Sequence, residues 1–155
     1  MVLTRFCRPI QTYLDYGAGT GEFASWAQEY LSAARVIVAD SSSEMLNQAR
    51  ERGLQTTSVP LTDMIRNLDL VTMFDVLEHV EDDVALLMEL RRKMTPDGVL
   101  FISVPAHPWL FGAHDKRVGH YRRYSQHALE KTLRNAGFNV VWTTWYNLFL
   151  FLRWF

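Results

Sequence analysis

Short apolar runs alternate with amphipathic stretches along the chain. Arg35–Ala39 contains Val-Ile-Val and predicts a buried strand, and Val99–Val104 has almost no polar residue and predicts another. By the same reasoning, further strands are expected at Thr12–Tyr16, Gln55–Val59, Leu70–Phe74 and Asn139–Trp145.

The stretches between these strands carry helix and turn signals. Ser41 followed by Glu44 is a capping-box pattern, which predicts a helix that starts there and ends at Gly53. Thr95–Gly98 predicts a turn, because Pro presets φ and Gly permits positive φ. Residues 105–124 are expected to be irregular. Other helices are expected over Glu22–Leu31, from about Asp83 to Met94, and from Ser125 to Gly137.

Strands that alternate with helices indicate βαβ units and a parallel sheet covered on both faces. Right-handed crossovers then give an α/β fold with a doubly wound, mostly parallel sheet. The length of 155 residues fits a single domain over residues 1–155. Ligands in such sheets bind outside the carboxyl ends of the strands, which is where the polar motifs of this chain fall.

Composition narrows the class of protein. A net charge of −1 argues against a nucleic-acid partner, since nucleic-acid-binding domains are normally basic. The single cysteine, Cys7, excludes a disulfide framework and fits a reducing cytosol. The sequence shows neither a signal peptide nor a run of about 20 apolar residues, so a cytoplasmic location is expected.

The most informative motif is a glycine loop after the first expected strand. Gly17, Gly19 and Gly21 allow a tight turn from strand to helix and let a ligand approach the backbone. Their Gly-x-Gly-x-Gly spacing differs from the Gly-x-Gly-x-x-Gly of dinucleotide-binding folds. Asp15, two residues before the loop, would repel a pyrophosphate but suits a cationic ligand. A nicotinamide-dependent oxidoreductase is therefore disfavoured.

Asp40 ends the second expected strand, at the distance from the loop where an acid can accept hydrogen bonds from both ribose hydroxyls. The alternative is that Asp40 only caps the following helix. Because Ser41 and Glu44 already supply a cap, the ribose interpretation is favoured.

These motifs resemble those of class I S-adenosylmethionine-dependent methyltransferases. Leu14–Gly21 is similar to their first motif, and Val38–Asp40 to the strand end that carries their ribose-binding acid. Phe74–Val80 resembles the motif that follows the fourth strand in small-molecule methyltransferases, including the quinone-biosynthesis type. Leu90–Gly98 resembles the helix and turn that lead into their fifth strand. The resemblance covers about residues 12–145 and is specific for cofactor and fold, not for the acceptor.

The resemblance implies a Rossmann-like sheet and S-adenosylmethionine as cofactor. In the family the sheet ends with an antiparallel pair of strands, whereas this chain stops at Phe155, where a seventh strand would begin. We therefore expect either a C-terminally truncated chain or a short member with an unusual sheet edge. The stretch Thr57–Asp63 leaves the adenine contact unassigned. The expected cofactor-binding residues are Asp15, Gly17, Ala18, Gly19, Gly21, Asp40, Ser41 and Asp75, the last near the sulfonium.

Methyl transfer from a sulfonium often needs a base for the acceptor proton. His79 follows the fourth strand and is the only side chain there that is an ordinary base near pH 7. The alternative is that Glu78 and His79 only order the loop. Whether oxygen, carbon or nitrogen would be methylated is left open.

Four of the five histidines lie between residues 105 and 127. Their spacings of seven, six and seven residues fit no compact ligand pattern, so no metal site is expected. The sequence instead predicts that His114–Tyr124 binds a small-molecule acceptor that is acidic, phosphorylated or lipid-linked. The predicted acceptor-binding residues are His114, Tyr121, Arg122 and Arg123, with His120 as a second candidate base.

The alternative for this segment is structural. Residues 69–89 carry seven acids and no Lys or Arg, whereas residues 114–134 carry six Lys and Arg and two acids. Tyr121 and the two arginines could therefore brace the segment against the acids of Asp75–Asp83. The aromatic C-terminal tail, Trp142–Phe155, is expected either to cover the sheet or to contact a second copy, a partner chain or a membrane surface. A non-catalytic cofactor-binding subunit is a second function consistent with this tail.

Overall fold

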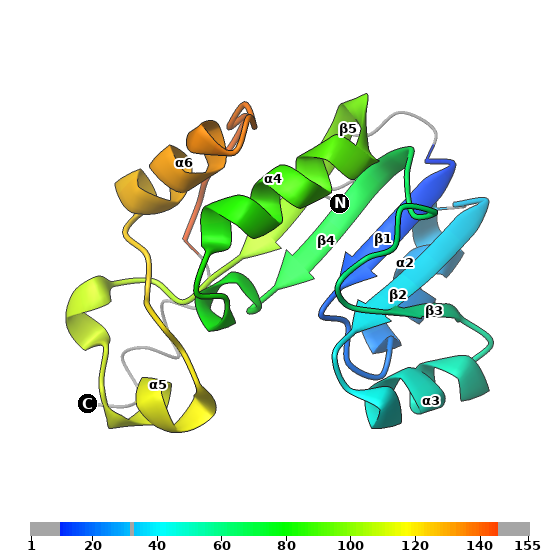
Figure 1. Ribbon diagram of the computed structural model, residues 1–155, viewed down its shortest axis with the longest axis horizontal. Helices are drawn as coiled ribbons and strands as arrows, with labels where there is room; N and C mark the ends of the chain where they lie inside the picture. The colour runs from blue at the N-terminus through cyan, green and yellow to red at the C-terminus, as the bar shows by residue number, and fades with distance from the viewer. Residues whose placement is uncertain (1–9, 32, 146–155) are drawn as a thin grey trace.

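A computed structural model describes residues 10–31 and 33–145 of the chain. Its sheet has five parallel strands in the order β3-β2-β1-β4-β5 (Figure 1). The strands are β1 (Thr12–Tyr16), β2 (Arg35–Asp40), β3 (Gln55–Ser58), β4 (Leu68–Phe74) and β5 (Met94–Ser103). The doubly wound, parallel α/β sheet predicted from the sequence is confirmed.

Helices cover both faces of the sheet. Residues of α4 and α6 belong to one hydrophobic cluster, and residues of α2 and α3 belong to another. Figure 1 shows α4 crossing in front of β4 and β5 while α2 lies behind β1 and β2. The helices are α2 (Glu22–Leu31), α3 (Ser43–Glu51), α4 (Asp83–Lys93), α5 (Ala113–Val118) and α6 (Gln126–Asn135), with 3₁₀ turns η1 (Leu77–His79) and η2 (Pro108–Leu110).

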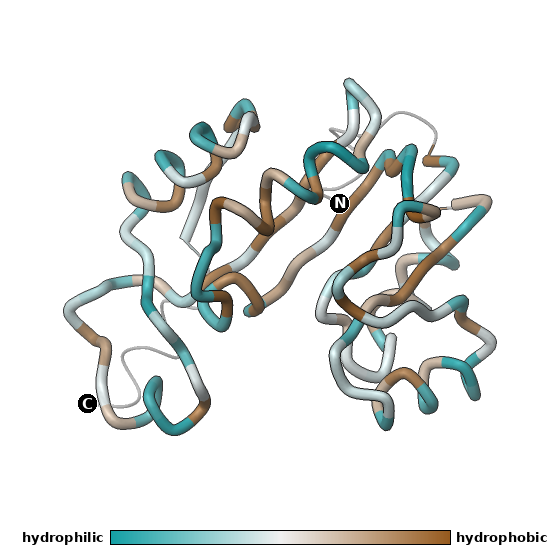
Figure 2. The backbone as a smooth tube through the Cα atoms, viewed as in Figure 1, coloured by the Kyte–Doolittle hydropathy of each residue, from teal (hydrophilic) through white to brown (hydrophobic). Residues whose placement is uncertain are grey.

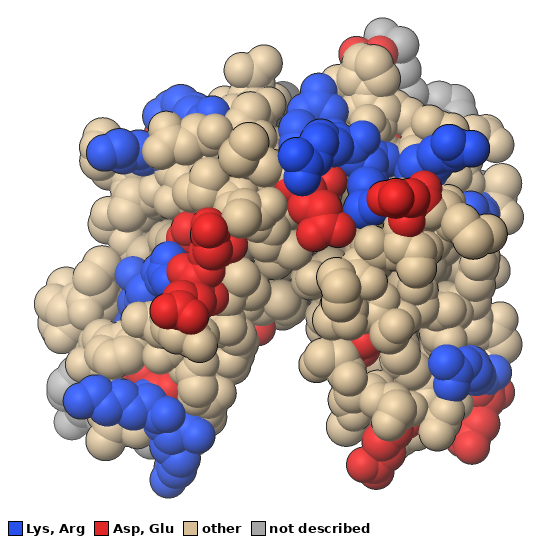
Figure 3. Space-filling model, viewed as in Figure 1, with Lys and Arg blue, Asp and Glu red and all other residues tan. Residues whose placement is uncertain are grey.

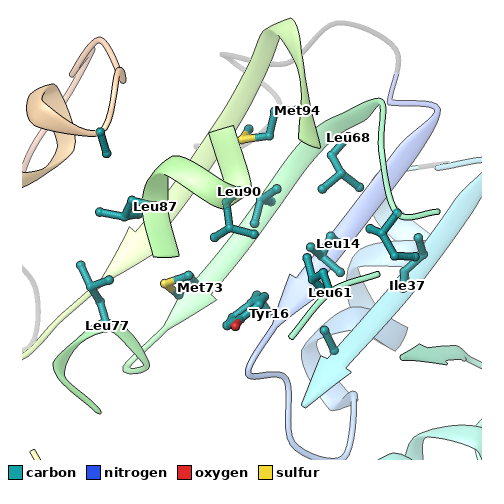
Figure 4. Close-up of a cluster of buried hydrophobic side chains, with 14 of the residues drawn as sticks. Leu14, Tyr16, Ile37, Leu61, Leu68, Met73, Leu77, Leu87, Leu90 and Met94 are labelled. Atoms are coloured by element: carbon teal, nitrogen blue, oxygen red, sulfur yellow. The ribbon is translucent and has the colours of Figure 1, made fainter. Parts of the chain in front are cut away.

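The central strand β1 is buried on both sides. Leu14 pairs with Ile37 of β2 and with Val71 of β4, and all three side chains are fully buried. Figure 2 shows the hydrophobic residues concentrated in the strands, and Figure 4 shows Leu87 and Leu90 of α4 packed over the sheet. Burial on both faces explains why the strands appear in the sequence as continuous apolar runs.

Two predicted local features are wrong. Residues 95–98 do not form a separate turn with a left-handed glycine, because β5 begins at Met94 and shifts register between Leu68 and Leu70 of β4. A Cβ on Gly98 would lie 2.7 Å from the Leu68 carbonyl oxygen, so this glycine permits a close backbone approach. The cap of α3 is Ser42, whose side chain accepts a hydrogen bond from the Met45 amide, and not Ser41.

The region after β5 also differs from prediction. The segment 105–124 contains the short helix α5 and is not wholly irregular. Asn139–Trp145 forms no strand. Thr143 instead donates to Glu130 of α6, and the Trp145 ring stacks on His107 at a centroid distance of 4.9 Å, so these contacts direct the segment toward α6 and η2.

The predicted tail contact cannot be followed to the end of the chain, because residues 146–155 lie outside the described residues. Trp142 and Trp145 are both half exposed. Among the helices of residues 10–31 and 33–145, none is long and apolar enough to cross a membrane.

A buried polar network joins β1 to β4. The Tyr13 hydroxyl and Thr72 Oγ1 are 2.7 Å apart, and Thr72 donates to Asp15 Oδ1 at 2.6 Å. Asp15 is 2% exposed, and this burial raises its pKa to about 6, although the hydrogen bonds from Thr72 and Tyr13 oppose the shift. Near neutral pH the ionised Asp15 carboxylate therefore destabilises the folded state, because the charge is buried.

This destabilisation should appear as a pH-dependent effect of Asp15→Asn. The folded Asp15 keeps its proton up to about pH 6, whereas an unfolded carboxyl releases it near its usual pKa of 3.8. The folded state thus binds more protons in this window, and stability falls as the pH rises through it. Relative to wild type, the free energy of unfolding of Asp15→Asn should rise by up to about 3 kcal/mol between pH 4 and pH 7.

Urea denaturation at pH 4 and pH 7 measures this difference. Glu29→Gln, which removes an exposed carboxyl group from α2, is the matched control. If the difference in unfolding free energy between Asp15→Asn and wild type stayed constant from pH 4 to pH 7, the raised pKa of Asp15 would be contradicted.

Candidate functional site

The loops that follow β1, β2, β4 and β5 meet at the carboxyl edge of the sheet, because all five strands are parallel. In the space-filling view a deep notch opens at this edge, between the part of the chain around α5 and the part around α3 (Figure 3). The chain order places β1 and β4 side by side although β2 and β3 come between them in sequence. This reversal is the position where open α/β sheets bind ligands.

The three glycines of the loop are all left-handed, with φ of 72° at Gly17, 55° at Gly19 and 73° at Gly21. A Cβ on Gly17 would collide with Val76, and one on Gly21 would lie 2.5 Å from Leu54. A Cβ on Gly19 would meet no atom within 4 Å. Gly17 and Gly21 are therefore required by packing, and Gly19 alone faces open space that a ligand could enter.

The strand end of β2 holds this loop in place. Ala39 O accepts hydrogen bonds from the amides of Gly17 at 2.7 Å and Ala18 at 3.3 Å. Asp40 Oδ2 accepts from the Gly19 amide at 2.9 Å, and its Oδ1 accepts from the Ser42 amide at 2.8 Å. Asp40 therefore helps to order the start of α3, and each of its oxygens keeps a second lone pair for a further donor. Its predicted ribose contact stays a prediction.

Asp75 lies beside the loop at the end of β4. It is exposed and left-handed, with φ of 52°, which is uncommon for a residue other than glycine. Its amide donates to Ser103 O at 3.1 Å, and its Oδ1 accepts from the Ser103 hydroxyl at 3.3 Å. The following residue, Val76, contacts the position of Gly17, so the segment after β4 borders the glycine loop directly.

The segment after β5 is organised around a buried carboxylate, Asp115, which is 1% exposed. Its Oδ2 accepts from the Gly112 amide at 2.9 Å, and its Oδ1 accepts from Arg123 Nε at 2.7 Å and His120 Nδ1 at 2.9 Å. Burial alone would raise the pKa of Asp115, but these hydrogen bonds together hold it well below its usual range. An ionised Asp115 accepts a hydrogen bond from His120 Nδ1–H, so in the neutral imidazole the lone pair lies on Nε2.

Both predicted acceptor-binding arginines have partners within the chain. Arg122 forms an ion pair with Asp83 Oδ2 at 3.0 Å and donates to Glu81 O at 2.6 Å. Arg123 is bound to Asp115 as described and points a second nitrogen at Ala106 O, 3.4 Å away. The contacts of Arg122 support the alternative of a brace against the acids of Asp75–Asp83, whereas Arg123 instead binds within its own segment.

The other two predicted acceptor residues lie on the surface. The Tyr121 ring is half exposed, with the Arg122 guanidinium 6.0 Å from its centroid. The His114 ring is exposed, and its Nδ1 lies 3.2 Å from Arg117 within α5. His114 is thus separated from His120, which faces inward.

The two predicted bases are brought together. The rings of His79 and His120 lie edge to face with centroids 4.6 Å apart. Glu78 completes the group: its Oε1 is 3.9 Å from His120 Nε2, and the residue is fully buried. Burial raises the pKa of Glu78 to about 7, with nearby Asp75 and Asp115 adding to the shift and Arg123 opposing it.

Sequence reasoning did not assign Glu78 or Asp115 to the site. Glu78 lies in an acid-rich stretch that looks solvated, and its signals were its place in the Phe74–Val80 motif and its position between Leu77 and Val80 after β4. Asp115 had no local signal, since its partners Gly112, His120 and Arg123 become neighbours only when the segment folds back on itself.

Comparison with known proteins gives the family. The family model described as a methyltransferase domain matches residues 3–143. An uncharacterized 37.1 kDa protein in a transposon of Streptomyces fradiae is 34% identical over 139 residues, which is 83% of this chain and 40% of that protein. A trans-aconitate 2-methyltransferase of Azoarcus is 34% identical over 99 residues, covering 61% of this chain and 39% of that enzyme.

Among solved structures, an S-adenosylmethionine-dependent methyltransferase from Mesorhizobium loti has the same fold. Its TM-score is 0.72 at 20% sequence identity, and the match covers 86% of this chain and 76% of that one. The chain spans about 40% of the length of the two curated relatives. The family model matches nearly the whole length of this chain, so the chain belongs to the methyltransferase domain family.

Proposed function

We propose that this chain binds S-adenosylmethionine and transfers its methyl group to a small-molecule acceptor. The observation that carries the proposal is the open, left-handed Gly19, whose amide is bound to Asp40 at the carboxyl end of the sheet. A bulky nucleoside can approach the backbone only where no side chain intervenes, and Asp40 supplies acceptors for ribose hydroxyls beside that point.

The cofactor is a sulfonium cation, so negative charge near it is favourable. Asp15 lies below the glycine loop and is ionised above its raised pKa of about 6, and Asp75 borders the loop from β4. Ala18 lies in the glycine loop and Ser41 directly follows β2, so both are next to the proposed cofactor position. Methyl transfer is a direct displacement, so the chief task of these groups is to align sulfur, methyl and acceptor.

The acceptor would enter from the side of the notch formed by residues 105–124. Lys116 and Arg117 are exposed in the last turn of α5, and Tyr121 and His114 are exposed on the same segment. An acid is the acceptor class that suits this positive rim. The Azoarcus relative is named for trans-aconitate, which is a carboxylic acid and so consistent with this class. His79 and His120 are the candidate bases for the acceptor proton.

Calorimetry with S-adenosylhomocysteine, followed by transfer of a labelled methyl group into fractionated cell extract, tests the proposal. We expect saturable one-to-one binding and a labelled small molecule of net negative charge. Binding without labelled product would instead support the non-catalytic subunit, and the absence of binding would refute both.

Gly19→Val should abolish S-adenosylhomocysteine binding, because the new side chain fills the space at the loop. The matched control is Gly53→Val, since Gly53 is also left-handed, at φ of 81°, and also has no atom within 4 Å of a built Cβ. Gly53 follows α3 and lies at the amino end of β3, away from the notch. Both variants should lose similar thermal stability, about 1–2 kcal/mol from backbone strain.

Calorimetry and thermal melts on the two variants separate binding from strain. If Gly19→Val binds S-adenosylhomocysteine as tightly as Gly53→Val does, the ligand does not approach this loop.

Asp40→Asn should weaken S-adenosylhomocysteine binding by tenfold or more, because a charge-assisted hydrogen bond is worth about 1.5–3 kcal/mol. Asn keeps one acceptor oxygen for the backbone amides that Asp40 now binds. The 2′-deoxy analogue of the ligand distinguishes ribose binding from loop ordering. Wild type should discriminate against that analogue in calorimetry, and Asp40→Asn should discriminate much less. Equal discrimination by both proteins would assign Asp40 to loop ordering alone.

A further inference from the structure

Two segments that are distant in sequence bring three metal-binding side chains, one glutamate and two histidines, close together. Glu78 and His79 belong to η1, and His120 follows α5. One ligand atom from each lies within 4.8 Å of the others. The Tyr121 amide donates to Glu78 O at 2.7 Å and fixes the two segments against each other. The histidine spacings in the sequence could not show this group, because two of its members lie outside the histidine-rich segment.

The Glu78 carboxyl group has no hydrogen-bond partner in the described part of the chain, although both of its oxygens are buried. Buried polar groups are almost always paired, since an unpaired one loses its hydrogen bonds to water without replacement. Its Oε1 points toward His120 Nε2, 3.9 Å away. The unpaired carboxyl group of Glu78 therefore indicates a binding partner from outside the chain.

The orientation of His120 is already that of a metal ligand. Asp115 accepts from its Nδ1 at 2.9 Å and fixes the tautomer whose Nε2 carries a lone pair. Metal-bound histidines typically have such a carboxylate on the second ring nitrogen. Asp115 is itself fixed by Arg123 Nε and the Gly112 amide, so the ring cannot easily turn away.

His79 completes the set from the solvent side. It is exposed, and its ring stands edge to face with that of His120. Two ligand atoms about 2.1 Å from a tetrahedral metal ion lie about 3.4 Å apart. The ligand atoms of this group lie within 4.8 Å of one another, and Glu78 Oε1 is 3.9 Å from His120 Nε2. Binding an ion would therefore draw the three side chains together by about 1 Å.

We propose that Glu78, His79 and His120 form a binding site for one divalent transition-metal ion of the zinc class, with Asp115 as the residue that positions His120. Two imidazoles and one carboxylate suit Zn²⁺, whereas Mg²⁺ prefers oxygen ligands. Three protein ligands leave at least one coordination position for a water or a ligand oxygen.

That open position lies next to the segment that borders the glycine loop, since η1 directly follows Val76. An oxygen of the acceptor bound there would become more acidic, and with the ion in place His79 and His120 would serve as its ligands and not as the bases. This role rests on the proposed function, whereas the metal site itself does not.

Titration of the full, tag-free chain with Co²⁺, followed by visible absorption and competed with Zn²⁺, tests the site. We expect one saturable ion per chain, displaced by Zn²⁺ and not by excess Mg²⁺. His79→Ala and His120→Ala should each weaken Co²⁺ binding by about tenfold or more. His127→Ala is the matched control, because His127 is exposed on α6 away from the cluster, and it should bind as wild type does.

His79 is exposed, so His79→Ala should leave the fold intact. This variant can therefore test the site even if Glu78→Gln or His120→Ala fails to fold. Weak or non-stoichiometric binding by wild type, or unchanged binding by His79→Ala, would overturn the site. S-adenosylhomocysteine affinity measured on the same proteins bears on the proposed function alone, so the two failures are distinguishable.

Discussion

Burial of β1 on both faces is the constraint from which the rest of the structure follows. Leu14 and Tyr16 pack into the cluster under α4, while Tyr13 packs into the cluster under α2. The strand can be covered in this way only if the chain winds outward to β3 and then returns across it to β4. That return brings the loops after β1 and β4 to one edge, and the glycine loop and η1 become neighbours there.

Most of the strands were predictable because they contain a local apolar run that is buried in the sheet, although the edge strand β3 is polar. Two of the wrong predictions depend on contacts between distant residues. Thr95–Gly98 has the composition of a turn, but hydrogen bonding to Leu68 of β4 draws Met94 into the sheet and leaves the intervening residues as an irregularity. Asn139–Trp145 has the composition of a strand, but Glu130 and His107 bind it elsewhere.

The candidate site divides in the same way. The glycine loop and Asp40 could be recognised from short motifs, because the loop must follow a strand directly. The group of Glu78, His79 and His120 could not, since it depends on the Tyr121 amide binding Glu78 O across two segments. The charge contrast between those segments was visible in the sequence, and its main consequence in the fold is the pairing of Arg122 with Asp83.

The many internal contacts of residues 105–124 have a thermodynamic consequence. Asp115 binds three donors, the Tyr124 hydroxyl donates to Asp83 at 2.7 Å, and the two arginines are neutralised by the chain's own groups. The entropy of ordering this segment is therefore lost during folding and not when a ligand arrives. The segment is therefore preorganised, so a ligand that bound against it would cause little further loss of chain entropy.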